Sequence, residues 1–126
     1  MSALYVGVGT CRDVAAAEVI ALVERTVTEA GTGAGPVAAL ATVDVRAAEP
    51  GLLAAAERLG VPLTAYAPAA LAAQPVPHPS EAARRTLGTA GVAEAAALLA
   101  AGPGAVLLVG KRKSAQATCA VARGPG

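Results

Sequence analysis

Aromatic side chains are almost absent from this chain. Its 126 residues include two Tyr and neither Phe nor Trp. Proteins that bind single-stranded nucleic acid stack the bases on aromatic side chains, and nucleic-acid binders generally carry a basic surface. Here ten basic and nine acidic residues nearly cancel. The composition therefore argues against a nucleic-acid-binding protein, and the core must be built from Val, Leu, Ile and Ala.

Cysteines and long apolar runs are also scarce. Cys11 and Cys119 are too few for a disulfide scaffold, which favours a reducing compartment. The apolar start, about six residues long, is shorter than the apolar region of a secretory signal peptide. No apolar run approaches the ~20 residues that span a bilayer. We therefore expect a cytoplasmic protein that does not insert into a membrane.

Apolar segments of strand and helix type alternate along the chain. Strands are expected over residues 3–8, 37–42, 63–66, 105–109 and 115–123, and helices over residues 13–30, 50–59, 68–73, 81–87 and 92–101. The short turn expected at 110–114 makes the last two strands antiparallel. The pattern predicts an α/β fold with three layers, α/β/α, around a mixed sheet of about five strands. We expect one domain over residues 1–123 and a loose tail over 124–126.

A glycine-rich segment, Gly7-Val8-Gly9-Thr10-Cys11-Arg12, is expected to form the turn between the first strand and the first helix. Open α/β folds bind ligands at the carboxyl ends of their strands, and main-chain N–H groups beside Arg12 would suit a carboxylate or phosphate. A dinucleotide fingerprint needs a third glycine where Arg12 stands, which disfavours a nucleotide site. Cys11 has no evident base to activate it as a nucleophile. The alternative is an ordinary glycine-rich turn.

The second polar segment, residues 42–49, follows a strand and precedes a helix. Asp44 and Glu49 are candidates for general acid–base catalysis. They are equally candidates for a helix-capping carboxylate and a salt-bridge partner of Arg46. Further along, Ser80 is well placed to cap the helix expected over 81–87.

The third polar segment is Lys111-Arg112-Lys113, in the turn expected at 110–114. If the strand before it runs parallel to the first strand, Lys111 meets Arg12 and Arg46 at one edge of the sheet. Three basic clusters at one edge would suit a ligand that carries several carboxylates or phosphates. No His or Cys residues have the spacing of a metal site, and we expect neither a metal nor another cofactor.

Five short motifs follow one another along nearly the whole chain. They are the Gly7–Arg12 segment; Ala41, Thr42, Asp44, Arg46, Glu49, Gly51 and Leu52; Pro79 and Ser80; Gly88 with residues 92–96; and Lys111 with Thr118, Ala120, Ala122 and Arg123. In this order and spacing, the chain resembles the CobE family and the C-terminal domain of CbiG, both of cobalamin biosynthesis. It departs from that pattern in the extra Thr10, in Arg46 where the family favours Lys, and in His78 where it has Asn.

The resemblance implies a part in building the corrin ring. Full-length CbiG is associated with opening the ring-A lactone of a cobalt-precorrin and with loss of a two-carbon fragment. The implied partner is a precorrin or corrinoid intermediate, bound for catalysis or for transfer between pathway enzymes. The implied acid–base residues are Asp44 and Glu49, and the implied ligand-binding residues are Gly9, Cys11, Arg12, Thr42, Arg46, Ser80 and Lys111. The alternative is a non-catalytic module that docks onto a pathway methyltransferase; a homodimer is left open.

Overall fold

A five-stranded mixed sheet organises the chain. The computed structural model describes residues 3–31, 35–74 and 89–124. The strands are β1 (Leu4–Thr10), β2 (Val37–Val43), β3 (Leu63–Tyr66), β4 (Val106–Lys113) and β5 (Ala117–Arg123), in the spatial order β3-β2-β1-β5-β4. β1, β2 and β3 are mutually parallel, and β5 is antiparallel to both of its neighbours. β4 therefore runs in the direction of β1, as the sequence required for its basic residues to reach the same edge.

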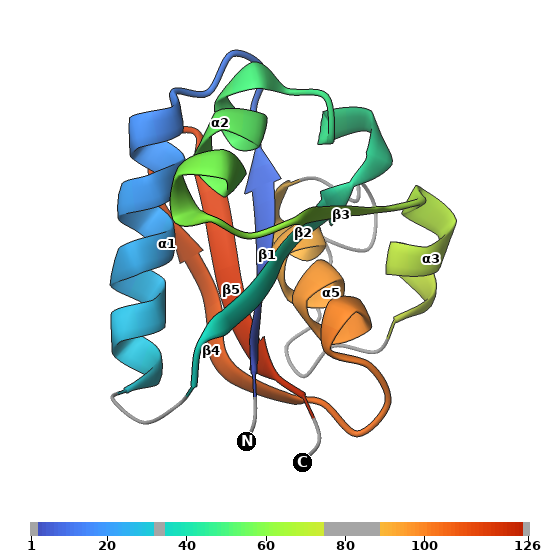
Figure 1. Ribbon diagram of the computed structural model, residues 1–126. Helices are drawn as coiled ribbons and strands as arrows, with labels where there is room; N and C mark the ends of the chain where they lie inside the picture. The colour runs from blue at the N-terminus through green and yellow to red at the C-terminus, as the bar shows by residue number, and fades with distance from the viewer. Residues whose placement is uncertain (1–2, 32–34, 75–88, 125–126) are drawn as a thin grey trace.

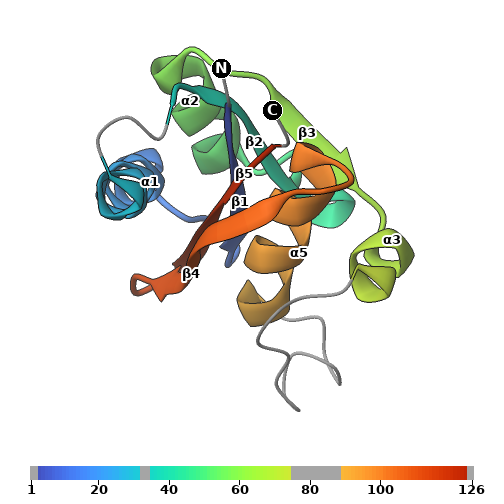
Figure 2. The same cartoon turned by 90° about the horizontal axis from the view of Figure 1, so that it is seen from below.

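Helices cover both faces of this sheet (Figures 1 and 2). On one face lie α1 (Ala16–Ala30) and α2 (Pro50–Leu59); on the other lie α3 (Pro68–Ala73) and α5 (Thr89–Ala101). A short 3-10 helix, η1 (Asp44–Arg46), follows β2. The predicted three-layer fold with an antiparallel final hairpin is confirmed. Ser80 and the helix expected over 81–87 lie outside the described residues.

The two faces of the sheet are packed with side chains of different size. On the α1 side, Leu4, Val6 and Val8 of β1 are fully buried and pack against α1 residues such as Val19 and Leu22. Since side chains alternate across a strand, the intervening residues of β1 face α5. That second face is built largely from alanine and glycine.

Gly7 is the point of closest approach between α5 and the sheet. A Cβ placed on Gly7 would lie 1.8 Å from the carbonyl oxygen of Ala93 and 2.7 Å from the nitrogen of Ala97. Its neighbour across the β1–β5 ladder is Ala120, which is also fully buried. The helix backbone therefore lies directly on β1, and small side chains on both surfaces are what permit this contact.

The turn predicted at Gly7–Arg12 was placed too early. β1 continues to Thr10, which is opposite Ala117, so Gly7 and Gly9 belong to the sheet. The connection begins at Cys11, and Asp13 adopts a left-handed conformation with φ 59°. A left-handed residue cannot continue a right-handed helix, which explains why α1 begins at Ala16 and not at Asp13.

The turn predicted at residues 110–114 was also wrong, because β4 continues through Lys113. The connection to β5 is residues 114–116, and Glu18 of α1 holds it. The Glu18 carboxylate accepts hydrogen bonds from the Ser114 hydroxyl and, at 2.6 Å, from the main-chain N–H of Gln116. These two bonds lower the pKa of Glu18. In the sequence, this basic run has the composition of a solvent-exposed turn. In the structure, its residues belong to an edge strand, and neighbouring side chains point to opposite faces of the sheet.

Among the described residues, no helix is long and apolar enough to cross a bilayer. Gly124 donates its N–H to the carbonyl oxygen of Ala3 at 3.2 Å, which joins the end of β5 to the start of β1.

The contact at Gly7 predicts a large loss of stability on substitution. In Gly7→Ala the methyl group meets the backbone of α5, which cannot move away as a flexible side chain would. We expect the free energy of unfolding to fall by at least about 3 kcal/mol, measured by urea denaturation.

The control is Gly60→Ala, whose methyl group enters open space and carries only the cost of a positive φ of 73°, about 1 kcal/mol. Equal losses in the two variants would contradict the close approach of α5 to β1.

Candidate functional site

Arg12 and Arg46 of the predicted site lie at the edge where β1 and β2 end, whereas Lys111 lies inside that edge, on β4 against Ala120 and therefore level with Gly7 of β1. Arg12 follows β1, Arg46 ends the 3-10 helix after β2, and Lys111 lies in the last part of β4. These three strands point to the same edge, at the top in Figure 1. Neighbouring strands are about 4.8 Å apart, so the three steps from β2 to β4 spread the basic positions over about 14 Å across the sheet. Because Lys111 is level with Gly7, it also lies about 10 Å from the end of β1 along the strand direction.

The side chains of these three cations are not engaged by other described residues. Arg12 is exposed, and Arg46 and Lys111 are half-buried. Within residues 3–31, 35–74 and 89–124, none of the three side chains makes an ion pair or a hydrogen bond. Arg112 differs, because its Nε lies 2.9 Å from Glu29 Oε1 on α1. Within the basic run, Arg112 is therefore a structural cation, and its neighbour Lys111 is available to a ligand.

Glu49 holds the loop that carries Arg12. Its Oε1 accepts a hydrogen bond of 2.6 Å from the main-chain N–H of Asp13, the left-handed residue. Beside it, a Cβ on Gly51 would lie 1.9 Å from the carbonyl oxygen of Val14. The start of α2 is thus packed tightly against the β1–α1 connection. Neither ordinary alternative for Glu49 is formed: its side chain does not cap α2, and among the described residues it has no ion pair with Arg46.

The remaining predicted site residues fall into two groups by exposure. Asp44 and Cys11 are exposed at the edge, and no described residue hydrogen-bonds to either side chain. Thr42 and Gly9 are buried in the sheet. The Thr42 hydroxyl donates to the carbonyl oxygen of Val8 at 2.7 Å and so links β2 to β1.

The two cysteines differ sharply in environment. Cys119 is fully buried, and burial raises the pKa of its thiol to about 12. Cys11 is exposed in the loop next to Arg12. Since the thiolate is the reactive form, Cys11 is the thiol of this pair that a reagent will modify in the folded protein. No described group of His, Cys, Asp and Glu residues has the arrangement of a metal site.

Glu94 of α5 is a residue that the sequence reasoning did not select for the site. It is 7% exposed, and its Oε2 accepts a hydrogen bond of 2.9 Å from the main-chain N–H of Lys111. A signal was available in the sequence: Glu94 is the one ionisable residue in the apolar segment 92–101.

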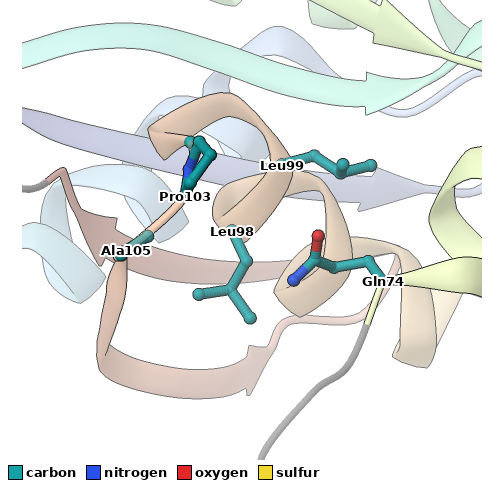
Figure 3. Close-up of a pocket in the computed structure, with 7 residues that line it drawn as sticks. Gln74, Leu98, Leu99, Pro103 and Ala105 are labelled. Carbon is teal, nitrogen blue, oxygen red and sulfur yellow. The ribbon is translucent and has the colours of Figure 1, made fainter.

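A hollow of about 250 Å³ lies at the opposite end of α5 (Figure 3). Its described lining is largely apolar and includes Leu98, Leu99 and Pro103, with Gln74 as the one polar side chain among the described residues. It adjoins the start of β4, so it is separate from the edge that carries Arg12 and Arg46. None of its described lining residues is charged.

Comparison with known proteins decides the family. The model of the family described as cobalamin synthesis G C-terminus matches residues 4–122. The chain belongs to this family. It is accordingly a cobalamin-biosynthesis protein of the CobE/CbiG type, and the resemblance drawn from the five motifs is confirmed.

Three relatives show how far the similarity extends. The chain is 46% identical over 121 residues to protein CobE of a Sinorhizobium species, covering 94% of this chain and 79% of that protein. It is 34% identical over 119 residues to a cobalt-precorrin-5A hydrolase of Priestia megaterium, covering 94% of this chain but 32% of the enzyme. A crystal structure of CobE, from the vitamin B12 pathway, superposes with a TM-score of 0.80 at 38% identity, covering 97% of this chain and 93% of that one.

The contact between Glu49 and Asp13 can be tested through the neighbouring thiol. In Glu49→Ala the Asp13 N–H loses its acceptor, and we expect the loop to open and Cys11 to react several-fold faster with iodoacetamide, followed by mass spectrometry. Glu49→Gln keeps a carbonyl oxygen as acceptor and should react at nearly the wild-type rate. Unchanged reactivity in Glu49→Ala would show that the carboxylate does not hold the loop.

Proposed function

We propose that this protein binds a precorrin-type tetrapyrrole at the edge of the sheet formed by Arg12, Arg46 and Lys111. The observation that supports the proposal is that these three cations lie in or directly after strands that run toward one edge, without carboxylate partners among the described residues. Positive groups left together without partners favour a ligand that brings its own negative charges.

The spread of the cations favours a large ligand over a single phosphate. Positions spread over at least about 14 Å cannot all contact one small anion. A tetrapyrrole intermediate carries acetate and propionate groups around its periphery and meets this requirement. Val45, between Asp44 and Arg46, is 72% exposed and offers an apolar contact for the face of the macrocycle.

Hydrolysis of the ring-A lactone is the reaction we assign to the site when it is catalytic. One relative is named cobalt-precorrin-5A hydrolase, and this chain corresponds to about a third of its length. Lactone hydrolysis adds water to the acyl carbon and breaks the acyl carbon–oxygen bond; a carboxylate takes a proton from the water, and the departing oxygen gains a proton. Asp44 is exposed at the edge and free for this task, whereas Glu49 Oε1 is engaged by Asp13.

Binding is common to catalysis and to the transfer of an intermediate, so binding is the property to test. Hydrogenobyrinic acid, a corrin with free carboxylates, is a suitable probe because its absorbance reports its surroundings. We expect Arg12→Gln and Lys111→Gln each to weaken its binding about tenfold, the usual effect of losing one charge-assisted hydrogen bond. Higher salt should weaken binding to the wild type more than to either variant.

The matched control is Arg112→Gln, which removes the same charge one residue from Lys111 but on the side of the sheet that faces Glu29. It should leave affinity within about twofold. If the wild type does not bind the probe, or if Arg112→Gln weakens binding as much as Lys111→Gln, the proposed site is wrong.

A further inference from the structure

Glu94 is a buried carboxylate that no cation of the described residues balances. It is 7% exposed, and the described residues give it no ion pair. Its hydrogen-bond partner is a main-chain group, the N–H of Lys111 at 2.9 Å. Burying a carboxylate is costly unless its charge or its hydrogen bonds bring a compensating gain. The hydrogen bond to the Lys111 N–H is therefore the interaction that compensates for the burial of Glu94.

β4 shifts its register against β5 twice: once between Leu107 and Val109, and again between Val109 and Arg112, where Glu94 meets it. Val109 is opposite Val121, and Arg112 is opposite Cys119. Two residues of β4, Gly110 and Lys111, therefore lie against the single residue Ala120 of β5. This is a β-bulge, which changes the alternation of side chains along the strand.

The bulge decides which basic residue faces which helix. Val109 and Cys119 both belong to the core under α1. If the side chains alternated regularly from Val109 onward, Lys111 would also lie on that face. Because of the extra residue, Arg112 takes the place opposite Cys119 and pairs with Glu29 of α1. Lys111 is thereby removed from the α1 face.

Gly110 leaves the space that Glu94 occupies. A Cβ on Gly110 would lie 3.1 Å from Glu94 Oε2, tighter than an ordinary contact. The bulge thus presents a glycine to the carboxylate and turns the next N–H toward it. β4 is an edge strand, so β5 is its one neighbour in the described sheet. The bulged residue Lys111 donates its N–H to Glu94 instead of to a neighbouring strand.

We propose that Glu94 is a positioning residue: it fixes the β4 bulge through the Lys111 N–H and so keeps the Lys111 ammonium away from Glu29 and available to an acidic ligand. The inference rests on the proposed function for the ligand, but the bulge itself is independent of it. In this role the carboxylate acts as a hydrogen-bond acceptor for the Lys111 N–H, and its charge does not interact with the ligand.

The test compares Glu94→Ala with Glu94→Gln. Glutamine keeps a carbonyl oxygen that can accept the Lys111 N–H; alanine does not. We expect Glu94→Ala to bind hydrogenobyrinic acid about tenfold more weakly, as Lys111→Gln does, and Glu94→Gln to bind within about twofold of wild type. Equal losses in Glu94→Ala and Glu94→Gln would overturn the proposal, as would wild-type affinity in Glu94→Ala.

A double variant separates positioning from general damage to the fold. If Glu94 acts through Lys111, adding Glu94→Ala to Lys111→Gln causes no further loss of affinity. A loss equal to the product of the two single effects would contradict the proposal. If Glu94→Ala does not fold, Gly110→Ala replaces it, since its methyl group crowds Glu94 Oε2, and the same pattern is expected.

Amide exchange in the free protein keeps this inference distinct from the proposed function. We expect the Lys111 amide to exchange at least about tenfold faster in Glu94→Ala than in wild type, and nearly normally in Glu94→Gln. If the wild type fails to bind the probe, the proposed function falls, and faster exchange at Lys111 still supports the role of Glu94 in the bulge. Unchanged exchange at Lys111 in Glu94→Ala overturns it.

Discussion

The packing of α5 directly on β1 is the contact on which the rest of the structure depends. Gly7 has no side chain to keep Ala93 and Ala97 away, and these two alanines are one helical turn apart, so they fix the rotation of α5 about its axis. Successive helix residues point about 100° apart. Once Ala93 faces β1, Glu94 is turned toward β4, and Leu98, one turn later, packs near Leu107 of the same strand. One glycine thus determines where the buried carboxylate lies.

Carboxylates from three helical regions hold segments near the candidate site by accepting main-chain N–H groups. Glu18 accepts from Gln116 in the β4–β5 connection, Glu49 accepts from Asp13 in the β1–α1 connection, and Glu94 accepts from Lys111 in the β4 bulge. Each hydrogen bond fixes a segment beside a basic residue and leaves the charge of that basic side chain unpaired among the described residues. An ion pair at the same places would have fixed the segments equally well but neutralised the cations that the proposed ligand needs.

Much of the fold was predictable because it depends on local patterns. α2, β3 and α3 have the predicted bounds, since Pro50 and Pro68 start helices and Gly60 ends one in a left-handed conformation. The two turns were misplaced because Gly7 and Lys111 have roles that depend on tertiary structure. Gly7 lies in β1 and lets α5 pack closely on the sheet, and Lys111 lies in the β4 bulge. Local sequence shows where a glycine or a basic run occurs, but it does not predict which element packs against it.

The candidate site was predictable in its strand directions and less so in the contacts of its residues. The order of elements implied that β1, β2 and β4 run the same way, but the position of Lys111 level with Gly7 depends on the register of β4 against β5. The engagement of Glu49 by Asp13 was not, since the two residues are 36 positions apart and their contact depends on the packing of α2 against a loop. Glu94 was visible as a lone charge in an apolar helix, but the bulge that it supports requires the register of β4 against β5.

The most direct test of this account is a crystal structure of the protein with bound hydrogenobyrinic acid. We predict that peripheral carboxylates of the corrin contact the side chains of Arg12 and Lys111, with the macrocycle lying over Val45 and Arg112 still paired with Glu29. A corrin bound in the hollow between Leu98 and Ala105, or one bound without contact to Arg12, Arg46 or Lys111, would contradict it.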